Sequence, residues 1–325
     1  MKRTLVIAGG LLLMLVVCWI SAGVGAVSIP MSGIAQVLLG GGEEQHQFIL
    51  MEYRLPRIVL SVLIGSGLAV AGVLLQGIIR NPLASPDVIG LTKGAGLAAV
   101  LFIVLLPKSP PGVLPFVAFL GAGLAGAILF ILSAGIRMGP SGLALSGIGI
   151  SALFTAGIQY VTVKHAVDAN TALLWLAGSL WGRGWEHVLL LFPWIVIVTL
   201  IALYYAKQLD LLSLGQQTAG SLGVAVGRVQ TVVLLLAVLV TGACVAVSGS
   251  IGFVGLIAPH MARRLAGPKH FGLLLMAGYL GAMLVLLSDL LGRWIIVPKE
   301  IPVGIVCAVL GAPYFLWLLR KESKG

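Results

Sequence analysis

The sequence contains very few charged residues. Only 9% of its 325 residues are charged, whereas 59% are hydrophobic. Ordinary soluble domains carry about a quarter charged residues, and so few charges cannot cover a surface that faces water. The apolar runs recur along the whole chain, so a cleaved signal peptide at the N-terminus does not explain them. The scarcity of charge excludes a water-soluble domain and predicts an all-α, polytopic membrane protein.

Cysteines and clustered basic residues are also scarce. The three cysteines, Cys18, Cys244 and Cys307, lie far apart inside apolar runs and show no metal-binding or redox spacing. The formal net charge is +10, but the basic residues lie singly or in short groups between apolar runs. They form no patch of the kind that binds nucleic acid. We therefore expect no metal site, no cofactor and no nucleic-acid partner.

Ionisable residues are nearly absent from the middle of the apolar runs. A charge at the centre of a membrane helix costs about 2.5 to 3.5 kcal/mol on insertion scales, so those that occur there usually serve transport. Glu52, Asp87 and Glu300 lie at the edges of runs, and none of the five histidines lies in the middle of one: His46, His165, His187, His260 and His270. This pattern argues against proton coupling through a buried carboxylate or histidine.

A nucleotide-binding loop and a catalytic constellation are absent from the sequence as well. No glycine-rich turn leads into Gly-Lys-Ser or Gly-Lys-Thr, and no nucleophile has a recognisable base. We therefore do not expect the chain to be an enzyme. If ATP drives its function, a separate subunit must hydrolyse it.

The sequence is rich in long apolar runs and contains 44 glycines. A helix needs roughly 20 mostly apolar residues to cross a bilayer, and small residues let such helices pack closely. Eight runs qualify, at positions 5–27, 58–79, 88–106, 114–136, 142–163, 188–206, 271–291 and 301–319.

The stretch 229–261 is too long for one ordinary helix and short for two. The segment Ser248-Gly249-Ser250 would divide it into one full and one short span, which gives ten spans. With the N-terminus inside, ten spans place most basic residues and both termini in the cytoplasm, in agreement with the positive-inside rule. A single span would move Arg263, Arg264 and Lys269 outside and reverse this bias.

Two connecting segments have distinctive compositions. Segment 170–186 carries Trp175, Trp181 and Trp185 among glycines, and we expect a short helix at the external membrane surface. Segment 209–228 is too polar and glycine-rich to span, yet its leucines could form an apolar face. A docking role and an amphipathic connector that rests on the bilayer fit this pattern equally well.

Three arginines run against the inside bias. Arg54 and Arg57 precede the second span, and Arg293 ends the ninth. Three outward-facing guanidinium groups could bind carboxylates of an acidic partner, although arginines at helix ends also reach lipid phosphates. Asp289 lies four residues before Arg293 and is predicted to pair with it.

A few polar residues lie within the spans. Gln76, Thr155 and Gln159 are candidates for lining a cavity. The alternative is that each forms a hydrogen bond to a neighbouring helix.

Three groups of residues form an ordered pattern along the chain. They are Tyr53-Arg54-Leu55-Pro56-Arg57 with Gly72-Val73-Leu74-Leu75-Gln76 and Asn81-Pro82-Leu83-Ala84-Ser85-Pro86; Ser248-Gly249-Ser250-Ile251-Gly252-Phe253-Val254-Gly255-Leu256-Ile257-Ala258-Pro259-His260; and Glu300-Ile301-Pro302-Val303-Gly304-Ile305 with Leu310-Gly311-Ala312-Pro313. This pattern resembles the permeases of binding-protein-dependent, ATP-driven importers for iron-siderophores, haem and vitamin B12. The resemblance covers nearly the whole chain.

The resemblance implies a type II ABC importer permease fold, with residues 1–325 forming one transmembrane domain. Such permeases dimerise, and the transport pathway lies between the subunits; the partner is an identical chain or a paralogous permease. Two separate ATP-binding cassette subunits and an extracytoplasmic substrate-binding protein complete the importer, which resides in the cell membrane.

The resemblance also implies roles for particular residues. Arg54, Arg57 and Arg293 match the arginines that dock the binding protein. The cytoplasmic loop at about 209–227, with Leu214, Gly215 and Gly223, matches the region that contacts the ATPase subunits. Ser141 and Gly142 match the inner gate.

The cargo expected from the resemblance is an iron(III)-siderophore type of ligand, with vitamin B12 or haem as alternatives. An ion-coupled secondary transporter is the competing class, because it would also have many spans and broken helices. The lack of mid-span carboxylates disfavours it.

Overall fold

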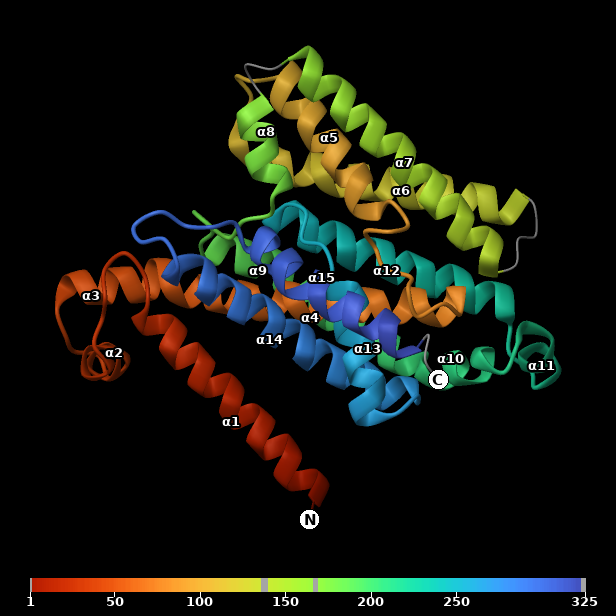
Figure 1. Cartoon of the computed structure of the whole chain (residues 1–325), viewed down its shortest axis with the longest axis horizontal. Coiled ribbons are helices and arrows are strands. Elements are labelled where there is room, and N and C mark those ends of the chain that lie inside the picture. Colours follow the sequence, from red (N-terminus) through yellow and green to blue (C-terminus); the bar gives the residue numbers. More distant parts are fainter. Residues whose placement is uncertain (1, 136–139, 166–168, 323–325) are drawn as a thin grey trace.

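Every regular element is a helix in the part of the chain that the computed structural model describes, which is residues 2–135, 140–165 and 169–322 (Figure 1). The predicted all-α class is therefore confirmed. The main helices are α1 (Lys2–Gly23), α4 (Leu55–Ile79), α5 (Leu91–Leu105), α6 (Leu114–Gly135), α7 (Pro140–Lys164), α9 (Trp185–Tyr204), α12 (Val226–Ser248), α13 (Val254–Ala266), α14 (His270–Trp294) and α15 (Val303–Glu322). The short helices are α2 (Met31–Leu38), α3 (Glu44–Phe48), α8 (Ala169–Leu176), α10 (Ala206–Ser213) and α11 (Gln216–Ser221).

The described helices agree with ten spans. Six are long and apolar enough to cross a membrane, and three shorter apolar helices lie within α1, α5 and α15. The tenth is α13, which has 13 residues. It follows a break after Ser248, as predicted, because α12 ends there and α13 begins only at Val254. Gly249 makes the break possible, since its φ of +71° is strained for residues that carry a Cβ.

The second span begins earlier than position 58. The helix runs without interruption over Glu44–Ile79, which is 36 residues, and it includes a π-helical turn at Ile49–Arg54. Pro56 lies in the first turn of α4. A proline ring clashes with the carbonyl group four residues earlier in an α-helix. The wider turn with i→i+5 hydrogen bonds relieves that clash, so the helix continues through the proline.

Helix α4 forms the centre of the bundle. It contacts α9, α12, α13 and α14. In its most apolar stretch, 83% of the residues are buried. Its backbone touches that of α14, because a Cβ on Gly65 would overlap the carbonyl oxygen of Gly281, and a Cβ on Gly281 would overlap that of Gly65. Glycines at these two positions permit the close approach by which helices associate in a bilayer.

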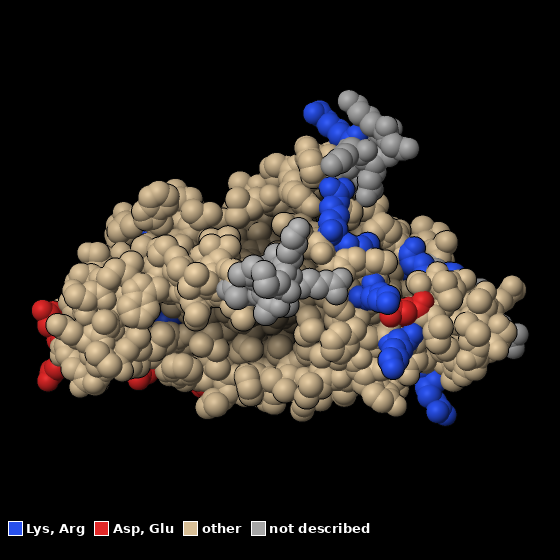
Figure 2. Space-filling view, turned by 90° about the horizontal axis from the view of Figure 1, so that it is seen from below, with Lys and Arg blue, Asp and Glu red and all other residues tan. Residues whose placement is uncertain are grey.

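The two ends of the bundle differ in charge. In Figure 1, α2 and α3 lie at one end, and α10 and α11 lie at the other. Figure 2 shows Lys and Arg gathered mainly toward the α10 and α11 end of the visible face, whereas Asp and Glu are prominent at the α2 and α3 end. Basic residues in or next to the helix ends near α10 are Arg80, Lys207, Arg228, Arg263, Arg264 and Lys269. This is the asymmetry on which the predicted orientation depends.

Segment 170–186 is helical in its first part, in α8, and again at its last two residues, where α9 begins. Helix α8 ends at Leu176, and the following loop packs on the break after α12 through the Ser179 N–H, which donates to the Ser248 carbonyl at 2.8 Å. Trp181 is 73% exposed. Trp185 begins α9, and its indole N–H donates to the Met51 carbonyl at 2.8 Å. The loop thus joins three parts of the bundle.

We predict that Gly65→Val destabilises the protein by about 1 to 3 kcal/mol, the range for overpacking a dense interior. The added side chain would force α4 away from α14. Thermal unfolding of the purified protein in detergent measures the loss. Gly123→Val in α6 is the matched control, because a Cβ at Gly123 meets nothing within 4 Å. Equal losses in both variants would contradict a special role for the α4 and α14 contact.

Candidate functional site

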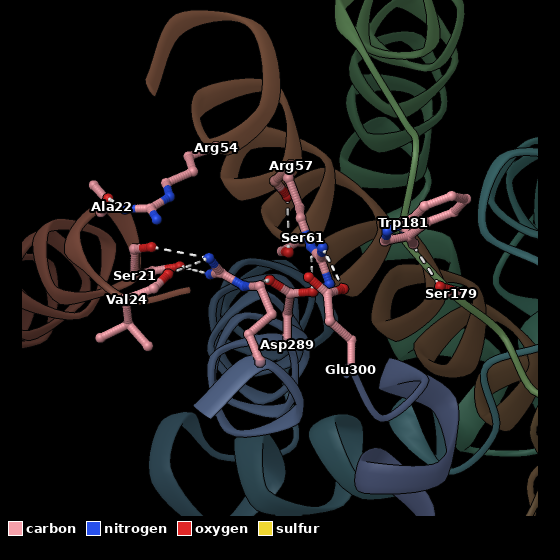
Figure 3. Close-up of polar contacts among 11 residues, drawn as sticks. Ser21, Ala22, Val24, Arg54, Arg57, Ser61, Ser179, Trp181, Asp289 and Glu300 are labelled. Atoms are coloured by element: carbon pink, nitrogen blue, oxygen red, sulfur yellow. Dashed lines mark hydrogen bonds and ion pairs between the residues drawn. The ribbon is translucent and has the colours of Figure 1, made fainter. Parts of the chain in front are cut away.

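Arg57 lies in the first turn of α4 and binds two carboxylates (Figure 3). Its Nε donates to Asp289 Oδ1 at 2.8 Å, and its Nη1 donates to Glu300 Oε2 at 2.7 Å. The Asp289 side chain, on α14, is 0% exposed, whereas that of Glu300, in the connection to α15, is 29% exposed. Arg57 therefore ties α4 both to α14 and to the segment that follows it, through charge-assisted hydrogen bonds.

Arg293, in the last turn of α14, turns toward α1. Its Nε donates to Asp289 Oδ2 at 3.1 Å, which confirms the predicted pair. Its Nη1 donates to the carbonyl groups of Ser21 and Val24 at 3.1 and 2.8 Å, and its Nη2 donates to the Ser21 hydroxyl at 2.5 Å. Asp289 is thus shared by two arginines, and these contacts offset the cost of burying the polar groups.

Arg54, in the π-helical turn, also turns toward α1. Its Nη1 donates to the Ala22 carbonyl at 2.6 Å, and its Nη2 donates to the Val27 carbonyl. A Cβ on Gly25 would lie 2.9 Å from Nη2, so the absence of a side chain there leaves room for the guanidinium group.

All three arginines lie at one end of the bundle, but the guanidinium groups of Arg54 and Arg293 are directed toward α1 and are not open to an acidic partner. Arg54 and Arg293 are only 6% and 4% exposed. The physical reason is that the last carbonyl groups of a helix have no partners within that helix, and cations are favoured near them. Here the carbonyl groups belong to α1 and the chain just after it. Whether these arginines also take part in docking stays a prediction.

The outer arginine cluster comprises Arg54, Arg57, Arg293, Asp289 and Glu300. Its formal charge is +1, because three arginines face two carboxylates. Its accessible part is the pair of Arg57 and Glu300. An external carboxylate could replace Glu300 on the guanidinium of Arg57, so the cluster is suited to bind an acidic group at this end of the bundle.

The elbow, defined as α10, α11 and the chain to residue 227, lies at the opposite end. Gly215 joins α10 to α11 with φ +113°, and Gly223 follows α11 with φ +84°. A side chain at either position would strain the backbone. Leu214 and Leu222 are 61% and 57% exposed, so the elbow carries two apolar side chains on its surface.

Ser141 and Gly142, the predicted gate residues, lie in the first turn of α7. Ser141 is exposed and Gly142 is half-buried. The turn that precedes them includes 136–139, which lie outside the described residues. Further along α7, the exposed side includes Gly149, Ala152 and Ala156.

Two polar contacts lie near the elbow. Gln76 accepts a hydrogen bond from Arg263 Nη2 at 3.1 Å, so it bonds a neighbouring helix, which was one of the two expected alternatives. The other contact was not predicted: Asp210 of α10 binds His270, the first residue of α14. The pairing was hard to foresee because the two residues lie 60 positions apart and no motif joins them.

We predict that Asp289→Ala destabilises the protein by about 3 to 5 kcal/mol, since it leaves the buried Arg293 without its carboxylate. Chemical or thermal unfolding in detergent measures the change. Glu43→Ala is the control, because Glu43 is 76% exposed and pairs only with His46 among the described ion pairs. Surface pairs of that kind contribute about 0 to 1 kcal/mol. Similar effects of the two substitutions would contradict a structural role for Asp289.

Comparison with known proteins identifies relatives along almost the whole chain. Residues 12–321 match the FecCD transport family. YfmE, the Fe(3+)-citrate import system permease protein of Bacillus subtilis (strain 168), is 50% identical over 312 residues, which cover 96% of this chain and 93% of YfmE. YfmD, a second permease of that system in the same organism, is 38% identical over 298 residues, which cover 92% of this chain and 89% of YfmD.

A solved structure shares the fold. It is described as an inward-facing conformation of a metal-chelate type ABC transporter, and it superposes with a TM-score of 0.88 at 33% sequence identity. The superposition covers 97% of this chain and 99% of the other. The type II ABC importer permease fold expected from the sequence is therefore confirmed, and the chain belongs to the FecCD transport family.

Proposed function

We propose that this chain is the membrane-spanning permease subunit of an ABC importer for an iron(III) chelate. The observation that carries this proposal is the 50% identity to a permease of Fe(3+)-citrate import over nearly the full length of both chains. ATP hydrolysis belongs to a separate subunit of such an importer, and this chain supplies the path through the bilayer. The cargo is an iron(III) chelate such as ferric citrate.

The outer arginine cluster is the surface on which the substrate-binding protein docks. This end of the bundle is extracytoplasmic in the proposed orientation, with both termini in the cytoplasm, and the basic residues near α10 support that orientation. Arg57 is the best-placed docking residue, because its side chain retains 12% exposure and that of its partner Glu300 is 29% exposed. Arg54 and Arg293 are predicted to assist, directly or by holding the surrounding chain in place.

The elbow is the contact region for the ATPase subunits. Leu214 and Leu222 support this role, because exposed leucines at the cytoplasmic end of a permease are suited to an apolar contact with a partner. Gly215 and Gly223 set the path of the chain on either side of α11 through their positive φ angles. Leu214, Gly215 and Gly223 are therefore the proposed coupling residues.

A second permease packs along α7, and the transport pathway lies between the two. Only 22% of the residues in the most apolar stretch of α7 are buried. The small residues Gly149, Ala152 and Ala156 are exposed. Small residues on a membrane helix favour contact with another helix. The presence of YfmE and YfmD in one system supports a paralogous partner. Ser141 and Gly142, at the beginning of α7, are the proposed inner gate.

We predict that Arg57→Lys weakens docking of the binding protein about tenfold, because lysine keeps the charge but loses the planar bidentate geometry. Binding to the permease complex in lipid nanodiscs measures the Kd. Lys299→Ala is the control, since Lys299 is an exposed cation beside Glu300. An unchanged Kd for Arg57→Lys would remove Arg57 from the docking surface.

Uptake measurements test the cargo and the energy source. We expect cells that lack this chain to lose uptake of radiolabelled ferric citrate while cobalamin uptake continues. The reconstituted complex should import ferric citrate only with ATP, whether or not an ion gradient is present. Import driven by a proton or sodium gradient without ATP would instead support a secondary transporter.

A further inference from the structure

A pair of short hydrogen bonds joins Asp210, in the elbow and 36% exposed, to His270 at the start of α14. His270 is 4% exposed, and its Nδ1 lies 2.6 Å from Asp210 Oδ1. The backbone N–H of His270 donates to the same oxygen at 2.8 Å. The Asp210 carboxylate thus binds both the ring and one of the free N–H groups at the start of α14, where a negative charge is favoured.

Helix α4 packs against both α10 and α14 next to this contact. A Cβ on Gly77 would lie 3.1 Å from His270 Nε2 and 3.2 Å from Leu209 Cδ2. Leu209 belongs to α10 and is completely buried. The absence of a side chain at Gly77 therefore lets α10 and α14 press against α4 at one point. We use the name inner joint for Gly77, Leu209, Asp210 and His270.

Helix α14 reaches from the inner joint to the outer arginine cluster. Its 25 residues correspond to a length of about 37 Å. His270 is its first residue, and Asp289 and Arg293 lie near its other end. Between these ends the backbone of α14 touches that of α4 at Gly65 and Gly281. A displacement of α10 would consequently act on α14, which is packed closely against α4. At their other ends, these two helices are joined by Arg57 and Asp289.

We propose that Asp210 and His270 are positioning residues that transmit movement of the elbow to α14. This inference rests on the proposed role of the elbow as the ATPase contact. The connection needs the two hydrogen bonds to Asp210 because α10 is only eight residues long. It is joined to α11 through Gly215, so without these bonds it would be held to α14 by packing alone. Asp210 also fixes the first turn of α14, so that a shift of α10 becomes a shift of the helix.

The test compares transport per ATP hydrolysed in the complete importer, reconstituted in proteoliposomes with the binding protein and ferric citrate. The variants are Asp210→Ala, His270→Ala and the double substitution. We expect each single variant to lower the ratio about tenfold, which corresponds to about 1.4 kcal/mol of lost coupling. The double variant should be no worse than either single one, because residues that act as one pair are not additive.

His270→Asn provides the conservative rescue. Its side-chain amide can donate to Asp210 much as Nδ1 does, so the ratio should return to within about threefold of the parent. His46→Ala is the matched control, since His46 lies at the opposite end of the bundle in α3. Co-purification of the ATPase subunits with each variant is measured in the same preparations.

The outcomes separate the two levels of the proposal. An unchanged ratio in Asp210→Ala and His270→Ala would overturn the inner joint, as would a loss of co-purification with an unchanged ratio in the complexes that remain. If the complete importer with the parent chain neither hydrolysed ATP through its ATPase subunits nor imported ferric citrate, the proposed function would be overturned instead.

Discussion

The contact between the backbones of α4 and α14 is the constraint on which the rest of the molecule depends. Gly65 and Gly281 remove the side chains that would otherwise hold the two helices apart. Apolar side chains gain little by leaving lipid for protein, so close backbone packing of this kind has to supply much of the association between membrane helices. Everything that acts at the two ends of the bundle is fixed relative to this pair.

Charge is confined to the ends of that pair, and each end uses it differently. In the outer arginine cluster, Asp289 accepts hydrogen bonds from Arg57 and Arg293. Arg57 also binds Glu300, and Arg293 also binds carbonyl groups at the end of α1. At the other end, the Asp210 carboxylate binds both the ring and the backbone N–H of His270, the first residue of α14. Arg57 and Arg293 share the Asp289 carboxylate, whereas the buried Arg54 guanidinium donates to backbone carbonyl groups instead of a carboxylate. Each of these contacts offsets part of the cost of burying a charge. The intervening spans can therefore remain apolar.

Much of the fold followed from the sequence because apolar length and glycine placement are local signals. The break at Ser248 and the pair of Asp289 with Arg293 were both predictable from spacing. The direction of the Arg54 and Arg293 side chains was not, because it depends on free carbonyl groups of α1 that are distant in sequence. The Asp210 and His270 pair escaped prediction for the same reason. Positions of side chains at the outer end were thus less predictable than the helices that carry them.

The π-helical turn at Ile49–Arg54 changes the directions in which Arg54 and Arg57 project from the helix. In a regular α-helix, residues three apart project from nearly the same side. A turn closed by i→i+5 bonds contains an extra residue, and Arg54 lies inside this turn whereas Arg57 follows it. Arg54 accordingly reaches α1 while Arg57 reaches α14. One widened turn therefore lets two arginines that are close in sequence bind two different helices, α1 and α14.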